Sequence, residues 1–317
     1  MSVIAFDRRL LILSGKGGVG KSTVAVALGL RAAEQGLETL ICEMGENEKI
    51  APLFGQAASS FRETPLGVPH LSSIYLDPQE AFNDYVRASL KLAALARPLT
   101  ESRLIKAFVQ AAPGLKEIMT LTKLMEFERL KDRKGKPKYD LIVLDAPATG
   151  HGMSLFRSPM LAMRATKVGP IYQKAKLISD LLSDATRTRM HIVTLAEEMP
   201  VSETVDMIAA MRSDLHIPLG EIIVNAVVPP AFSQASADLL QILQQPATRK
   251  ATGACWGTAG ADAVLAVAEH MDGRSRLNAH YLARLQKETN LDSVVLPFVF
   301  DAPWTVASVH HLVERLR

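Results

Sequence analysis

The sequence of 317 residues contains only two cysteines, Cys42 and Cys255, which lie far apart along the chain. No CxxC pair occurs, so the sequence supports neither a zinc site nor a disulfide framework. Soft metalloids are bound by clustered thiolates, and two isolated cysteines do not predict such a cluster. The low cysteine content is typical of a reducing compartment, and the cytoplasm is the expected location.

Long apolar runs and blocks of one charge are also absent. Without a run of 18 apolar residues, no transmembrane helix is expected, and residues 1–13 have the pattern of a segment leading into a strand rather than of a signal peptide. The 36 basic residues exceed the 33 acidic ones by three and are dispersed, so nucleic-acid binding is not indicated. An apolar fraction of 48% is ample for a core.

Short apolar runs separated by helical segments predict an α/β fold with a mostly parallel, doubly wound sheet. Residues 45–78, with several Gly, Pro and Ser, are expected to be irregular. One domain is expected over residues 1–317, with helical insertions at about 78–137 and 153–187, the first including a helix over 101–111. The expected strands cover residues 10–13, 38–42, 139–144, 191–195, 221–225 and 293–296.

The clearest motif has the spacing GxxxxGK[ST] and lies between the first expected strand and a helix over residues 21–34. Its glycines let backbone N–H groups turn towards phosphate oxygens, and the helix N-terminus adds partial positive charge. Lys21 is expected to neutralise the β- and γ-phosphates of ATP, and Ser22 to bind Mg²⁺. The expected nucleotide contacts are Gly15, Lys16, Gly17, Gly18, Val19, Gly20, Lys21, Ser22 and Thr23.

Asp145 ends an apolar strand, which is the position of a Walker B acid, so Asp145 and Ser22 are the expected Mg²⁺ ligands. Residues 145–151 (Asp-Ala-Pro-Ala-Thr-Gly-His) closely resemble the switch II segment of the arsenite-pump and tail-anchored-protein-targeting ATPases. Lys16 resembles the signature lysine of the deviant Walker A loop in the wider class, which includes the partition ATPases. The segment ending at His151 distinguishes the chain from generic partition ATPases.

The resemblance extends over roughly residues 10–316 and implies a P-loop ATPase that requires Mg²⁺. In that family, the nucleotide state controls the conformation of a dimer, formed with a second copy or with a paralogue, and the binding of a partner. The resemblance implies that Lys16 reaches the nucleotide of the facing subunit. It also implies that Asn225, Pro297 and Phe298 complete the adenine pocket, and a single-copy chain of this length resembles a bacterial member.

Switch I departs from the family pattern, which is Asp-Pro-Ala-His-[Ser/Asn] with an aspartate that orients the attacking water. This chain has Cys42-Glu43-Met44-Gly45-Glu46-Asn47-Glu48 instead. Glu43 is the first candidate for the catalytic carboxylate and Glu46 the second. The other interpretation is that both acids belong to a surface loop. A catalytically weak, nucleotide-dependent binding or scaffold protein is therefore the alternative to an ATPase, with a partition-type ATPase as a further alternative.

Methionines are frequent in the two helical blocks, at Met119 and Met125 in the first and at Met153, Met160 and Met163 in the second. Such stripes usually pack in a protein core. In the targeting ATPases that the chain resembles, the equivalent helices form a groove for an apolar client, and flexible thioethers suit such a surface. Core packing and a client groove both stay open as interpretations. Arsenite is not an expected ligand.

Overall fold

The computed structural model describes residues 4–45, 47–58, 61–89, 114–230 and 237–316. Their strands form one eight-stranded sheet in the order β3-β4-β2-β5-β1-β6-β7-β8, and only β3 runs antiparallel to its neighbour. The predicted α/β fold with a mostly parallel sheet is therefore confirmed. The strands are β1 (Leu10–Ser14), β2 (Thr39–Glu43), β3 (Thr64–Pro65), β4 (Leu71–Tyr75), β5 (Leu141–Asp145), β6 (Thr188–Leu195), β7 (Ile222–Val227) and β8 (Ser293–Pro297).

Helices cover both faces of this sheet, which is why its strands are nearly continuous apolar runs. Leu11 and Leu13 of β1 belong to a core cluster with α1 and α12, whereas Leu10 and Ile12 point to the cluster under α6 to α9. The helices on the first face are α1 (Lys21–Glu34), α2 (Ile50–Leu53) and α12 (Val306–Leu316). Those on the second face include α6 (Leu115–Arg129), α7 (Thr149–Thr166), α8 (Pro170–Ser183) and α9 (Glu198–Ala210), which continues as a π-helical segment (Met211–Leu215).

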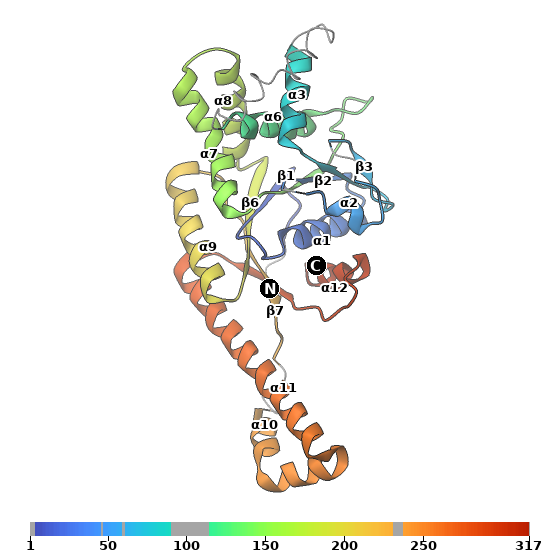
Figure 1. Ribbon diagram of the computed structural model, residues 1–317. Helices are drawn as coiled ribbons and strands as arrows, with labels where there is room; N and C mark the ends of the chain where they lie inside the picture. The colour runs from blue at the N-terminus through green and yellow to red at the C-terminus, as the bar shows by residue number, and fades with distance from the viewer. Residues whose placement is uncertain (1–3, 46, 59–60, 90–113, 231–236, 317) are drawn as a thin grey trace.

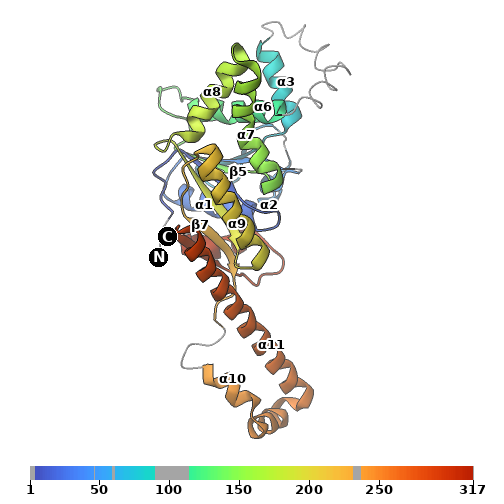
Figure 2. The same cartoon turned by 90° about the vertical axis from the view of Figure 1, so that its left-hand side faces the viewer.

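The molecule is elongated, with helices at both ends of the sheet (Figures 1 and 2). Helices α3 (Pro78–Ser89), α6, α7 and α8 gather at one end. At the other end, α10 (Ala237–Gln244) and the distal part of α11 (Pro246–Thr289) project away from the sheet as an arm. Gly257 interrupts α11 with a non-helical backbone, φ 73° and ψ 158°. None of the described helices is both long enough and apolar enough to cross a membrane.

The base of the arm is joined to the sheet through the buried side chain of Asn278 in α11. Its Oδ1 accepts a hydrogen bond from Val228 N, and its Nδ2 donates one to Ala196 O, both at 2.9 Å. These two backbone groups directly follow the ends of β7 and β6. One amide side chain therefore fixes α11 against the carboxyl ends of two strands.

The expectation of an irregular segment over residues 45–78 is wrong, because this segment contains α2, β3 and β4. Strand β4 pairs in parallel with β2, and its two serines, Ser72 and Ser73, weakened the apolar signal that would have indicated it. The start of β6 also differs, since this strand begins at Thr188 rather than at 191. The helix expected over residues 101–111 lies outside the described residues.

A buried carboxylate in α6 connects the helical end of the molecule to the sheet. Glu128 is 4% exposed and accepts hydrogen bonds from Arg187 Nη2 at 2.6 Å and Arg187 Nε at 3.2 Å. Arg187 directly precedes β6. Arg9, which precedes β1, adds a hydrogen bond from its Nη1 to Glu128 O at 3.1 Å. Loss of the arginine would leave a buried charge without its main partner.

We expect Arg187→Met to lower the free energy of unfolding by about 1–3 kcal/mol, because Glu128 would lose its bidentate partner. Urea denaturation followed by circular dichroism measures this change. Arg133→Met is the matched control, since Arg133 is exposed and its replacement should shift the midpoint little. Equal stability of the two variants would show that the Glu128 pair does not support the junction.

Candidate nucleotide site

Two glycines of the loop between β1 and α1, Gly15 and Gly20, are required by close approaches of neighbouring strands. A Cβ atom on Gly15 would lie 2.1 Å from the carbonyl oxygen of Val193 in β6. A Cβ atom on Gly20 would lie 2.3 Å from Asn225 Nδ2, and Gly20 also has a φ of 89°, in the left-handed region. Only glycine avoids both the contact and the strain, so the loop is fitted tightly between β6 and β7.

Asn225, within β7, is buried and lies against this loop. Its Nδ2 donates a hydrogen bond of 3.0 Å to Val19 O, so the predicted adenine-side residue contacts the loop itself. Pro297 ends β8, and Phe298 N donates to Val227 O at 2.9 Å. The Phe298 ring is 42% exposed and lies beside Phe300. These two residues are therefore near β7 but do not line the cavity described below.

The ammonium group of Lys21 folds back over the loop. Its Nζ donates hydrogen bonds to Gly15 O at 3.1 Å and to Lys16 O at 3.0 Å. Burial lowers the pKa of Lys21 from its ordinary value, and the nearby carboxylate of Asp145 opposes that shift. Lys21 is thus held over the centre of the loop, where the negative charge of a phosphate group would stabilise its charged form.

Asp145 and Ser22 form the pair predicted to bind Mg²⁺. Ser22 Oγ donates a hydrogen bond of 2.5 Å to Asp145 Oδ2, while the buried Asp145 Oδ1 has no hydrogen-bond partner among the described residues. Burial raises the pKa of Asp145 to about 6, although Ser22 and Lys21 act in the opposite direction. An unpartnered carboxylate oxygen beside a hydroxyl suits a hard cation, so these residues fit Mg²⁺ bound together with nucleotide phosphates.

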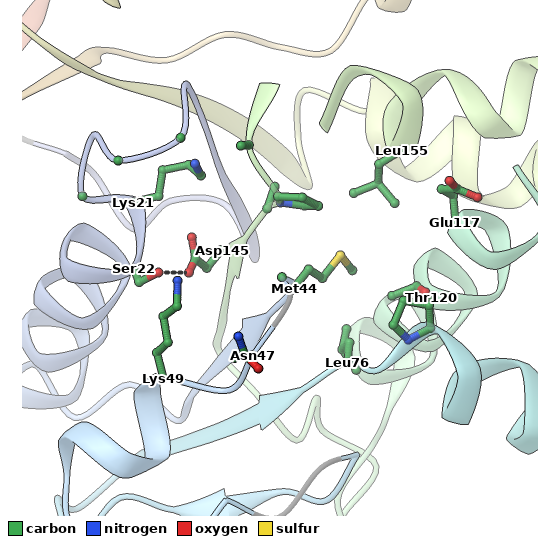
Figure 3. Close-up of a pocket in the computed structure, with 18 of the residues that line it drawn as sticks. Lys21, Ser22, Met44, Asn47, Lys49, Leu76, Glu117, Thr120, Asp145 and Leu155 are labelled. Carbon is green, nitrogen blue, oxygen red and sulfur yellow. Dashed lines mark hydrogen bonds between the residues drawn. The ribbon is translucent and has the colours of Figure 1, made fainter. Parts of the chain in front are cut away.

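A cavity of about 690 Å³ opens beside this pair and extends from the loop to α6 (Figure 3). Its size falls within the range of small-ligand sites. The walls come from the loop, from the segment after β2, from the residues after Asp145, and from the first turns of α6. The lining residues include Gly17, Gly18, Gly20, Lys21, Ser22, Thr23, Met44, Gly45, Asn47, Lys49, Lys116, Glu117, Thr120, Asp145, Ala146, Pro147 and Ala148.

Glu43, the predicted water-positioning residue, is buried at the end of β2 and does not line this cavity. Its carboxylate accepts hydrogen bonds from Lys49 N at 2.9 and 3.0 Å and from Ile50 N at 3.1 Å. Burial raises the pKa of Glu43 to about 7, and these backbone hydrogen bonds oppose the shift. The carboxylate therefore binds the backbone N–H groups at the start of α2. Glu46, the second candidate, lies outside the described residues.

Lys16 lies outside the cavity and contacts α9 of its own chain. Its Nζ lies 2.6 Å from Glu203 Oε1, in an ion pair whose side chains are 29% and 39% exposed. The sequence alone did not indicate this partner, because Glu203 follows Lys16 by 187 residues. In this structure, the signature lysine is thus engaged within the chain.

The predicted switch II segment begins at the cavity and runs into α7. Ala146, Pro147 and Ala148 line the cavity, so the segment adjoins the expected phosphate position. The side chains of Thr149 and His151 are outside the part of the structure that is described, and the switch role of this segment stays a prediction.

The methionines of the helical blocks are buried or half-buried. Met119 and Met125 belong to the core cluster, and Met153 packs against it. Exposed apolar side chains are nevertheless present around the same helices, and they are Leu130, Leu161, Val168 and Leu177. Both predicted roles of these helices, core packing and client binding, therefore stay open.

Two cavity-lining side chains that sequence reasoning missed carry chemistry of their own. Lys49 lies in the divergent switch I region, and a lysine in this region could have indicated a phosphate contact. Thr120 has no such signal, because its place in the cavity depends on how α6 packs over the sheet.

We expect the free energy of unfolding of the nucleotide-free protein to fall between about pH 4.5 and 7 because of Glu43. Its pKa rises from an ordinary 4.5 to about 7 on folding, so the folded state holds a proton that the unfolded state has released. Glu43→Gln should remove about 1–3 kcal/mol of that loss. Urea denaturation across this pH range tests it, with the exposed Glu314→Gln as control. An unchanged pH dependence in Glu43→Gln would contradict the assignment.

Several known proteins resemble this chain in sequence. ATPase BagA of Mycobacterium tuberculosis is 30% identical over 225 residues, which cover 70% of this chain and 66% of that protein. ATPase GET3B of Arabidopsis thaliana is 24% identical over 277 residues, covering 71% of this chain and 66% of that protein. The arsenical pump-driving ATPase of Acidiphilium multivorum is 24% identical over 254 residues, covering 74% of this chain and 42% of that protein.

The chain thus spans slightly less than two thirds of the length of the first two relatives. A family model described as anion-transporting ATPase matches residues 8–169 and 162–245, which include the glycine loop, Asp145 and Asn225. The match therefore covers the segments that build the cavity as well as most of the sheet. The chain belongs to the anion-transporting ATPase family.

Proposed function

We propose that the protein binds Mg²⁺ and ATP in the cavity between the glycine loop and α6, and that it hydrolyses ATP. The observation that carries this proposal is the Ser22–Asp145 pair, which holds an unpartnered, buried carboxylate oxygen beside the N-terminus of α1. Backbone N–H groups of the loop and the ammonium group of Lys21 then face the phosphates. The bound Mg²⁺ would supply positive charge at the phosphate oxygens.

The chain's own part in hydrolysis is mainly electrostatic. Lys21 leaves its two loop carbonyl oxygens and donates to phosphate oxygens, which balances charge that develops as the terminal phosphate departs. The residues after Asp145 line the same cavity. The presence or loss of the terminal phosphate would therefore directly affect the position of the segment that leads into α7.

Lys21→Ala should abolish ATP turnover, because no other described lysine is held over the loop carbonyl oxygens. Steady-state phosphate release at saturating Mg-ATP measures the effect, and a loss of at least about a hundredfold is expected. Lys134→Met, an exposed lysine outside the cavity, should retain wild-type turnover. Turnover by Lys21→Ala equal to wild type would exclude this site.

A second candidate function is a nucleotide-dependent binding or scaffold module with little catalysis. The engagement of the Glu43 carboxylate with the start of α2 favours it, since the cavity lining then lacks the expected water-positioning acid. A single-turnover experiment with excess protein over Mg-ATP discriminates the two functions. ATP that stays bound for hours without phosphate release would favour the scaffold and contradict the ATPase proposal.

We further propose a dimer, with itself or with a paralogue, in which Lys16 leaves Glu203 and contacts the nucleotide of the facing subunit. The support is the resemblance of the loop to the deviant Walker A class, together with an ion pair that is partly exposed on both sides. Exposed ion pairs contribute little to stability, so the exchange of Glu203 for a phosphate partner is energetically accessible. The exposed apolar residues on the helical end are the proposed contact for an apolar client.

Substitutions of the two partners of this ion pair should change ATP-dependent dimerisation in opposite directions. Lys16→Ala should leave ATP affinity within about twofold and weaken ATP-dependent dimerisation by about tenfold, whereas Glu203→Gln should strengthen dimerisation because it frees Lys16. Light scattering at several protein concentrations, with and without Mg-ATP, measures both. Dimerisation that responds to neither substitution would contradict the intersubunit role of Lys16.

A further inference from the structure

The segment that connects β2 to α2 brings a second lysine to the phosphate end of the cavity. Gly45, Asn47 and Lys49 line the cavity from this segment. The side chain of Lys49 extends from the start of α2 towards the Ser22–Asp145 pair, with Lys21 on the opposite side of that pair (Figure 3). Among the described residues, no carboxylate forms an ion pair with Lys49.

The backbone beneath Lys49 is fixed by Glu43. Both oxygens of this carboxylate accept from Lys49 N, at 2.9 and 3.0 Å, and one of them also accepts from Ile50 N at 3.1 Å. Glu43 belongs to β2 and lies in register with Asp145 on the neighbouring strand. The start of α2 is thereby anchored to the same strand ends that carry the predicted metal-binding carboxylate.

Two ammonium groups lie beside the Ser22–Asp145 pair. Lys21 and Lys49 approach from two sides, and both act electrostatically on the buried carboxylate of Asp145. If Mg²⁺ occupies that carboxylate, both ammonium groups can bind a further anion. A terminal phosphate at this position supplies oxygens for both lysines, whereas a diphosphate places its last phosphate one position further back along the loop.

We propose that Lys49 contacts the terminal phosphate of the nucleoside triphosphate, and that Glu43 is the positioning residue that holds Lys49 in place. The inference rests on the proposed function. It assigns to Lys49 the discrimination between a nucleoside triphosphate and a diphosphate. Glu43 then acts on the nucleotide through the backbone of the connecting segment. The contact to the phosphate would thus come from the switch I region, which is the region that contains the catalytic aspartate in the family pattern.

Lys49→Met tests the contact through the difference between two ligands. Isothermal titration calorimetry with Mg²⁺ gives the Kd of a non-hydrolysable ATP analogue and of ADP. We expect the analogue to bind at least about tenfold more weakly to the variant while ADP changes less than about twofold. The control Lys134→Met should match the wild type for both ligands. Equal weakening for both ligands, or no change for either, would overturn the contact.

Two substitutions of Glu43 separate positioning from water activation. Glu43→Gln keeps an oxygen acceptor for the two backbone N–H groups, so it should preserve the preference for the triphosphate. Glu43→Leu removes the acceptor and should lose the preference as Lys49→Met does, with no further loss in the double variant. Loss of turnover in Glu43→Gln with unchanged triphosphate affinity would instead make Glu43 the water-positioning residue.

The outcomes also separate this inference from the proposed function. A wild-type protein that binds neither nucleotide removes the proposed function itself. A wild-type protein that binds both, with Lys49→Met unchanged, removes the role of Lys49 alone. Because ADP affinity reports a folded site, Glu43→Leu is interpreted only where its ADP affinity is retained, and Glu43→Gln and Lys49→Met decide the question otherwise.

Discussion

The carboxyl ends of β1, β5 and β2 lie side by side because these strands pair in parallel without a register offset. Asp145 is aligned with Leu13 of β1 on one side and with Glu43 of β2 on the other. A slip of one residue would turn Asp145 towards the opposite face of the sheet and separate it from Ser22. Since both faces are covered by helices, the apolar alternation of the strands fixes this register, and the site depends on it.

Local patterns in the sequence were sufficient to place the glycine loop after β1 and Asp145 at the end of β5, because each position depends on one strand and the residues directly after it. Strand β4 was missed, since its central serines gave no apolar alternation. The orientation of the Glu43 carboxylate depends on two backbone N–H groups of a segment whose fold the sequence did not indicate. The contribution of Thr120 depends on packing between α6 and the sheet, which no local pattern encodes.

The cavity has one wall from the sheet and one from the helical end of the molecule. Lys116 and Thr120 line it from α6, while the glycine loop lines it from the sheet. The same helix is joined to the start of β6 through Glu128 and Arg187. A ligand that fills the cavity therefore contacts two layers that are otherwise connected at the opposite end of α6. The proposed hydrolysis would therefore take place where the sheet and the helical end of the molecule meet.

The arm formed by α10 and the distal part of α11 is attached to the sheet at its base alone among the described residues shown in Figures 1 and 2. Asn278 fixes α11 to the backbone just after β6 and β7, and these are the strands between which the glycine loop is held. From Asn278 to the break at Gly257, the helix rises about 30 Å. A tilt of about 10° at Asn278 therefore displaces the distal end by about 5 Å over that length. A shift of these strand ends that tilted α11 would therefore be amplified at the distal end of the arm, far from the cavity.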